Sequence, residues 1–161
     1  MIKFKIIAII LLFGAFAFSC NGQEAKASKD LAKESVVPTD SLQLKLTLGD
    51  KVLYAKFKDS PTTQDFIKQL PLNLKMGDLR GREKYSPLAA ELSKEGVVST
   101  TFEEGDISYW LGGGLAVFYH QNNSEVKAGL IVLARLENGM EAFSGPDPLD
   151  VKFEAVKINE Q

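Results

Sequence analysis

The stretch that decides the fold is residues 105–143, GDISYWLGGGLAVFYHQNNSEVKAGLIVLARLENGMEAF. It contains two nearly continuous apolar runs, at 115–119 and 129–136, which are typical of strands covered on both faces. Three glycines at 112–114 favour a tight or bulged connection between strands. Asn138-Gly139 is the strongest hairpin signal of the chain. This order of features indicates a compact β-barrel with a shaped apolar groove, and the stretch contains no obvious reactive group.

Alternation of apolar and polar residues indicates further strands on both sides of this stretch. Leucines alternate with polar residues over 42–48, Gly49-Asp50 supplies a two-residue hairpin turn, and 51–57 returns with one apolar face. Residues 72–76 form a third alternating segment. A last strand lies within 151–158, either at 151–155 or at 156–158 after a bulge. Seven or eight short strands with glycine-marked turns predict a mainly β fold, a closed barrel.

One short helix is expected between the second and third strands. Ser60 is placed to cap this helix, Pro61 suits its first position, and Pro71 ends it. Its apolar face consists of Phe66, Ile67 and Leu70. A helix of this length would plug one end of the barrel.

Four charged or turn-like segments are expected to be loops. Residues 78–84 carry several charges and a glycine, which predicts a loop or an edge. Residues 85–96 contain an apolar turn and at most one turn of helix. The acidic pairs Glu103-Glu104 and Asp147…Asp150 resemble acid–base dyads in composition. They stand beside glycine or proline, so we expect solvated loop charges there.

The N-terminus has the composition of an export signal. Two lysines within residues 1–5 precede an apolar run at 6–18, which is too short to cross a bilayer as a helix. Ser19-Cys20 ends this run and resembles a bacterial lipobox, with Ala17 in place of the usual leucine and a bulky Phe18. The resemblance implies that residues 1–19 are a lipoprotein signal peptide and that Cys20 is lipidated. The alternative is an ordinary signal peptide with a chance cysteine.

Residues 20–40 are expected to form a flexible tether between the lipid and a single domain at 41–161. The segment 21–40 lacks aromatic residues and is rich in Lys, Glu, Ser and Ala, so it cannot bury enough apolar surface to fold. Removal of residues 1–19 lowers Lys+Arg from 19 to 17 against 21 acids, a net charge of 17 − 21 = −4. This balance argues against a nucleic-acid partner. We therefore expect an exported protein, anchored by lipid in the cell envelope on the periplasmic or outer-membrane face.

Six short segments, in their order and spacing, resemble the bacterial cyclophilin-like domain. They are Ser60-Pro61-Thr62-Thr63, Gln69-Leu70-Pro71-Leu72, Glu83-Lys84-Tyr85, Gly105-Asp106-Ile107-Ser108-Tyr109-Trp110, Leu115-Ala116-Val117-Phe118-Tyr119 and Gly129-Leu130-Ile131. Domains of this family are small β-barrels that occur alone, at the end of a flavodoxin, or behind lipoprotein signals. The resemblance covers about residues 42–158 and implies the closed cyclophilin-like barrel. Most members of the family have no established activity.

True cyclophilins are prolyl isomerases that use an arginine in a Phe-His-Arg segment beside a proline pocket. This sequence has no such segment, and its arginines are Arg80, Arg82 and Arg135. Because fold does not determine function, we expect a non-catalytic module that binds a peptide or a small ligand. Two alternatives remain open. One is a weak prolyl isomerase or folding assistant of the envelope, and the other is an envelope adaptor that uses an acidic outer face.

The candidate ligand groove is built from residues that combine apolar area with a polar tip, together with their aromatic neighbours. They are Phe102, Tyr109, Trp110, Tyr119, His120 and Phe143. Successive side chains of a strand point to opposite faces of the sheet. We therefore expect one of Tyr109 and Trp110, and one of Phe118 and Tyr119, to face the core.

No cofactor or metal is expected. His120 is the only histidine and Cys20 the only cysteine, which cannot build a zinc site of the usual kind. The sequence has no nucleophile elbow, P-loop or dinucleotide fingerprint. The glycines at 112–114 could cradle an anion through their N–H groups, but neither a following helix nor a lysine supports that role.

Overall fold

The computed structural model describes residues 38–158. The predicted signal peptide, Cys20 and most of the predicted tether lie outside these residues. Within them the chain forms, in order, η1 (Thr39–Ser41), β1 (Leu42–Leu48), β2 (Lys51–Phe57), α1 (Pro61–Gln69), β3 (Leu72–Leu79), β4 (Glu83–Pro87), β5 (Val98–Ser99), β6 (Asp106–Trp110), β7 (Gly114–Phe118), β8 (Leu130–Leu136), η2 (Met140–Ser144) and β9 (Leu149–Lys157).

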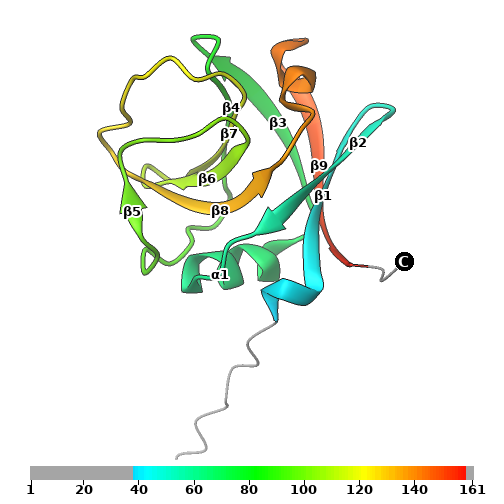
Figure 1. Cartoon of the computed structure of the whole chain (residues 1–161), viewed down its shortest axis with the longest axis vertical. Helices are drawn as coiled ribbons and strands as arrows, with labels where there is room; N and C mark the ends of the chain where they lie inside the picture. The colour runs from blue at the N-terminus through cyan, green and yellow to red at the C-terminus, as the bar shows by residue number, and fades with distance from the viewer. Residues whose placement is uncertain (1–37, 159–161) are drawn as a thin grey trace, which may run out of the picture. The chain divides into compact units, whose positions relative to one another are not determined.

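Eight of the strands close into an antiparallel barrel (Figure 1). The order around the barrel is β2-β1-β9-β3-β4-β7-β6-β8, and β8 returns to β2 through the pairs Ala55↔Leu136, Lys56↔Arg135 and Phe57↔Ala134. The short β5 pairs with the start of β8, on the part of β8 that β2 does not reach. The prediction of a closed, mainly β barrel with one short helix is confirmed for the described residues.

The hairpin of β1 and β2 follows directly from its local sequence. Leu48 pairs with Lys51 across a two-residue turn, and Gly49 has φ of 61°, a conformation that favours glycine. Alternate residues of both strands then face the core, where Leu44, Leu46 and Ala55 are buried. The alternation in the sequence therefore sets the register as well as the presence of the hairpin.

Helix α1 begins and ends where the sequence predicts. The Ser60 hydroxyl accepts a hydrogen bond from the Thr63 N–H at 3.0 Å, Pro61 takes the first helical position, and the helix stops before Pro71. Phe66 and Ile67 are buried on its inner face. The helix lies across one end of the barrel, and η2 and the β3–β4 turn lie at the other end (Figure 1).

Two clusters of buried apolar residues form the core. The inner cluster fills the barrel and includes Leu46, Phe66 and Phe153. The outer cluster lies on the other face of β7 and consists of Phe102, Ala116, Phe118, Val126 and Leu130. Phe102 stacks on Phe118 with ring centroids 4.1 Å apart. β7 is thus covered on both faces, as its continuous apolar sequence predicts.

The structure corrects the prediction of a hairpin at Asn138-Gly139. Gly139 has φ of 83°, as a hairpin turn would require, but the chain enters η2 instead of returning beside β8. The next strand, β9, pairs with β1 and β3 on the other side of the barrel. Asn138-Gly139 does change the direction of the chain, as predicted. The strand that follows it pairs with β1 and β3 because of long-range contacts that the turn does not set.

One other expectation is wrong in detail, and the structure decides two alternatives that the sequence left open. Residues 78–84 are not a loop, because β3 continues to Leu79 and β4 starts at Glu83, leaving a tight turn between them. Residues 88–97 contain no helix. Of the two alternatives for the last strand, the one at 151–155 holds, since β9 runs without a bulge from Leu149 to Lys157 and keeps one register with β1. A register shift occurs between β6 and β8, at Ile107/Ser108.

The cap of α1 gives a direct test of the fold. We expect Ser60→Ala to lower the free energy of unfolding by about 1 kcal/mol, because a helix N–H loses its acceptor. Urea denaturation of the full chain measures this change. Ser60→Asp is the control, since aspartate caps a helix equally well and should leave the stability nearly unchanged. Equal losses in the two variants would contradict a capping role.

Candidate functional site

The six predicted groove residues do not line one groove. Tyr109 and Phe143 are fully buried in the inner cluster, and Phe102 is buried in the outer one. Trp110 is half-buried, with its ring edge-on to Tyr85 at a centroid distance of 5.6 Å. Only two of the six, Tyr119 and His120, line a common surface hollow. Tyr109 is buried and Trp110 is half-buried, as the alternation of side chains along a strand predicts. Ligand binding by these residues remains a prediction.

The hollow lies at the end of the barrel opposite α1 and has a volume of about 620 Å³. It is bounded by the β3–β4 turn, by the loop before β6, by the end of β7 and by η2. The residues that line it are Gly81, Glu104, Tyr119, His120, Met140, Glu141 and Ser144. Ligand sites commonly occupy the mouths of β-barrels, so the hollow is the first candidate for a binding site.

An ionic cluster around a buried lysine adjoins the hollow at Tyr119. The Tyr119 hydroxyl donates a short hydrogen bond to Asp78, which also accepts from the Gly81 N–H at 2.6 Å. The Lys84 ammonium, fully buried, lies 3.5 Å from Asp78 Oδ2 and 3.6 Å from Asp147 Oδ1. It also donates to the Pro146 carbonyl at 3.0 Å. We call Asp78, Lys84, Tyr119 and Asp147 the barrel-end cluster.

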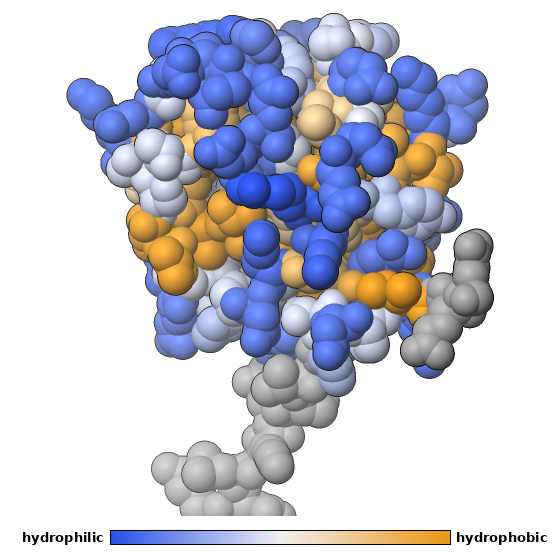
Figure 2. Space-filling view, in the orientation of Figure 1, coloured by the Kyte–Doolittle hydropathy of each residue, from blue (hydrophilic) through white to orange (hydrophobic). Residues whose placement is uncertain are grey.

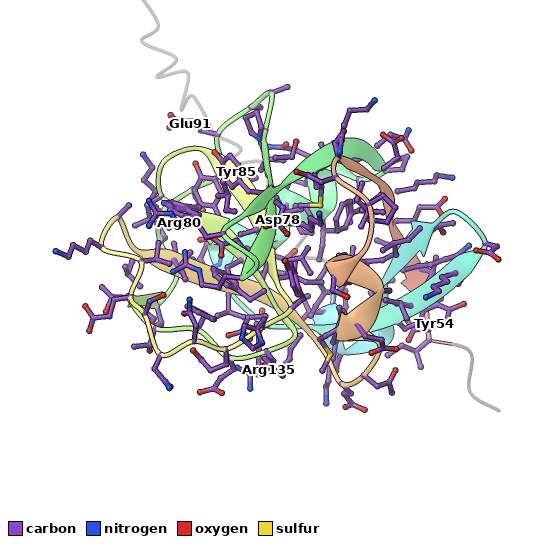
Figure 3. All side chains as sticks on the ribbon, turned by 90° about the horizontal axis from the view of Figure 1, so that it is seen from above. Tyr54, Asp78, Arg80, Tyr85, Glu91 and Arg135 are labelled. Carbon is purple, nitrogen blue, oxygen red and sulfur yellow. The ribbon has the colours of Figure 1, made fainter. Side chains whose placement is uncertain are left out.

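The register of β3 and β4 brings the cluster together. Asp78 and Lys84 are direct cross-strand partners, so their side chains lie on the same face of the sheet. Lys84 is also opposite Val117, a residue of the inner cluster, which places the lysine on the barrel's inner face. Asp147 adds a hydrogen bond to the Asp78 N–H at 2.8 Å. Figure 3 shows Asp78 near the middle of the view from above, beside the segment that contains η2.

The surroundings of Asp78 and Tyr119 shift their pKa values in opposite directions. Burial raises the pKa of Asp78, but hydrogen bonds from Tyr119 and Gly81 and the charge of Lys84 outweigh it, so the net pKa is lowered. The pKa of Tyr119 is raised, first by burial and then by its hydrogen bond to the Asp78 carboxylate. The carboxyl is therefore ionised and the phenol protonated at neutral pH, and the phenol acts as a hydrogen-bond donor.

Comparison with known proteins agrees with this architecture. The sequence pattern that defines the cyclophilin-like family matches residues 46–154, more than half of the chain. The chain belongs to the cyclophilin-like family. Among solved structures, it is similar to the solution structure of the hypothetical protein AF2241 from Archaeoglobus fulgidus, with 19% identity and a TM-score of 0.57 over 73% of this chain and 96% of that one. This likeness concerns the fold alone. No curated protein matches the sequence.

Two arginines of this cyclophilin-like domain are engaged in ion pairs. Arg82 binds both carboxylate oxygens of the buried Glu83, and its guanidinium lies 5.2 Å from the centre of the Phe102 ring. Arg135 donates to Asp106 at 2.7 Å. Each guanidinium is thus paired with a carboxylate.

Sequence reasoning missed the barrel-end cluster although one signal for it was present. Continuing the alternation of Leu72, Leu74 and Met76 by one step places Asp78 on the inner face of β3. Asp147 is also more than a solvated loop charge, because it contacts Lys84 and the Asp78 N–H. Nothing in the local sequence indicates those contacts, which join residues more than 60 positions apart.

The remaining candidates are placed as follows. Gly113 has φ of 98° and donates to the Trp110 carbonyl at 2.8 Å, so the triple glycine forms the tight turn between β6 and β7. A Cβ on Gly114 would lie 2.3 Å from the Tyr85 ring, which explains a glycine there. Among residues 38–158 no group of three or more His, Cys, Asp or Glu side chains is placed to hold a metal ion. No helix in this part of the chain is long and apolar enough to span a membrane.

The barrel-end cluster predicts a specific loss of stability in acid. The pKa of Asp78 is lower in the folded protein than its ordinary value of 3.8. The carboxylate therefore stabilises the fold above that ordinary value, and this contribution is lost as the pH falls below it. We expect Asp78→Asn to flatten the decline in unfolding free energy below about pH 4, measured by urea denaturation at a series of pH values.

Asp150→Asn is the matched control, because the Asp150 side chain is 81% exposed and lies 4.0 Å from Lys75. This variant should keep the acid-dependent loss of the parent chain. If Asp78→Asn retained the full decline, Asp78 would not be ionised within a stabilising cluster.

Proposed function

We propose that this domain is a non-catalytic binding module that takes a small, positively charged ligand in the hollow at the barrel end. The observation that carries the proposal is the double role of Tyr119. Tyr119 lines the hollow, and its hydroxyl donates a hydrogen bond to Asp78 in the barrel-end cluster. Concave sites whose titratable residues have shifted pKa values are favoured candidates for function.

The charge of the lining favours a cationic ligand. Glu104, from the loop before β6, and Glu141, from η2, line the hollow together with the uncharged residues Gly81 and Met140. His120 Nδ1 lies 3.8 Å from Glu104 Oε1, so Glu104 and Glu141 are the two carboxylates among the lining residues and His120 lies beside the first of them. The ligand class is therefore a small amine or guanidine, either free or as the basic side chain of a peptide.

The chemistry of the same residues supports binding without catalysis. Tyr119 is held protonated, Asp78 accepts two hydrogen bonds, and the Lys84 ammonium has three acceptors. Such groups orient a ligand but leave no activated nucleophile or base. The alternative function, prolyl isomerisation, requires an arginine beside an apolar pocket, and the pairing of Arg82 and Arg135 argues against that role.

The proposal includes the site of action. Lipidation of Cys20 would hold the barrel at a membrane of the cell envelope, and the residues that follow it would act as a tether. A flexible segment of about 20 residues spans roughly 25 Å on average, enough to clear the lipid head groups. The support for this is the order of basic, apolar and Ser19-Cys20 segments in the sequence.

Small amines test the ligand class. We expect putrescine and arginine amide to bind the full chain, and succinate not to bind, as measured by calorimetry. Glu104→Gln and Glu141→Gln should each raise the Kd about fivefold, since a carboxylate near an amine contributes about 1 kcal/mol in water. Glu91→Gln, in the exposed segment after β4, is the control and should leave the Kd unchanged.

Two results would overturn the proposed function. One is amine binding that is equal in the parent chain and in the double glutamine variant. The other is prolyl isomerase activity of the full chain that falls when Tyr119 is replaced by phenylalanine, because the site would then be catalytic.

Anchoring has a separate test. Cells that express the chain and are fed an alkyne-labelled fatty acid should label it, and Cys20→Ser should abolish the label and release the protein from the membrane fraction. Ser124→Cys combined with Cys20→Ser restores a thiol on the barrel and controls for nonspecific acylation. Membrane association that survives Cys20→Ser would contradict lipid anchoring.

A further inference from the structure

The first half of β2 has an open edge. β2 pairs with β1 from Lys51 to Lys56, but β8 covers only Ala55–Phe57 on its other side. The Lys58 N–H donates to the Leu133 carbonyl, so main-chain groups of even-numbered residues point toward the β8 side. Because this direction alternates along a strand, the N–H and C=O groups of Val52 and Tyr54 point to the open edge. Such an edge is a template for another strand.

An apolar groove follows the same part of β2. It has a volume of about 550 Å³, and the side chains of Val52, Tyr54 and Ile158 that line it are 44%, 51% and 46% exposed. These are three of the five large hydrophobic residues that are exposed among residues 38–158. The other two are neighbours at β5, Val97 and Val98. Figure 2 shows hydrophobic side chains at the surface near β5 and near the end of β9, within a mostly hydrophilic face.

The charges of the groove are unbalanced. Asp40, Asp59 and Glu137 line it, against the single basic residue Lys56. A partner that lies in the groove therefore gains from basic side chains, and the exposed apolar residues favour apolar side chains beside them.

We propose that the groove binds an extended peptide segment that adds to β2 as a strand and carries alternating apolar and basic side chains. Its main chain pairs with Val52 and Tyr54, its apolar side chains cover Tyr54 and Ile158, and its lysines or arginines face the three carboxylates. Strand addition of this kind takes affinity from main-chain hydrogen bonds and specificity from side-chain pockets. The site is separate from the barrel end, since Tyr54 and Asp78 lie far apart in Figure 3.

The geometry favours a free segment over a second copy of this chain. β2 itself has basic and apolar residues, KVLYAKF, so two copies could in principle pair through this edge. The open part is only Lys51–Tyr54, because β8 occupies the edge from Ala55 onward. In a dimer, each copy would bring its own β8 against the end of the other strand. A free extended peptide has no such flanking strand.

Synthetic heptapeptides test the proposal on the full chain. We expect a fluorescently labelled KVKVKVK peptide to bind, as measured by anisotropy. The EVEVEVE peptide should bind at least about tenfold more weakly because its charge is reversed. A KVKPKVK peptide should also lose about tenfold because proline removes a ladder hydrogen bond. Hydrogen exchange should slow at the Val52 and Tyr54 amides when KVKVKVK is bound.

Matched variants assign the site. Tyr54→Ser should weaken KVKVKVK binding by about fivefold or more through lost apolar contact. Val98→Ser, at a residue of similar exposure on β5, should leave binding unchanged, and Glu141→Gln in the barrel-end hollow should leave the slowed exchange at Val52 and Tyr54 unchanged. Binding that is lost on Glu141→Gln but not on Tyr54→Ser would overturn the proposal. So would a dimer in sedimentation that Tyr54→Ser dissociates, or unchanged amide exchange at Val52 and Tyr54 in the parent chain.

Discussion

Closure of the sheet by the pairing of β2 with β8 is the constraint on which the rest of the structure depends. It rests on three residue pairs, from Ala55↔Leu136 to Phe57↔Ala134. An eight-stranded barrel is just wide enough for its own side chains to fill, and the inner cluster fills this one. Any ligand must therefore be held at a barrel end or on the outer surface. β8 ends at Leu136, opposite Ala55, so the start of β2 has no strand paired with it on the β8 side.

The buried Lys84 has a second structural consequence. A lysine charge removed from water carries a penalty of several kcal/mol unless it is paired and hydrogen-bonded. Here Asp78, Asp147 and the Pro146 carbonyl surround the ammonium. Because these groups come from β3 and from the segment before β9, the lysine holds the two segments together just beyond the last β3–β9 pair, Met76↔Leu149. The position of Tyr119, and with it one wall of the hollow, depends on the same contacts.

Features set by neighbouring residues were predictable. Gly49-Asp50 makes its turn, Ser60 caps α1, and the alternation of β1 and β2 sets their register, because each effect acts over a few residues. The resemblance to cyclophilin-like domains was also sufficient to predict a closed barrel, which the family match over residues 46–154 supports. The candidate site was predicted only in part, since Tyr119 and His120 reach the hollow whereas Tyr109 and Phe143 are core.

By itself the sequence determined most of the strands, the helix and the family, because periodicity, turn chemistry and short motifs are local properties of a chain. Only the tertiary structure decided which charges meet and which edges remain open. Asp78 and Lys84 are six residues apart, yet their third partner, Asp147, lies more than 60 positions further along. Asn138-Gly139 likewise reverses the chain, but barrel closure sends the next strand to β1 and β3. Such contacts depend on the pairing order of all eight strands, which no local pattern encodes.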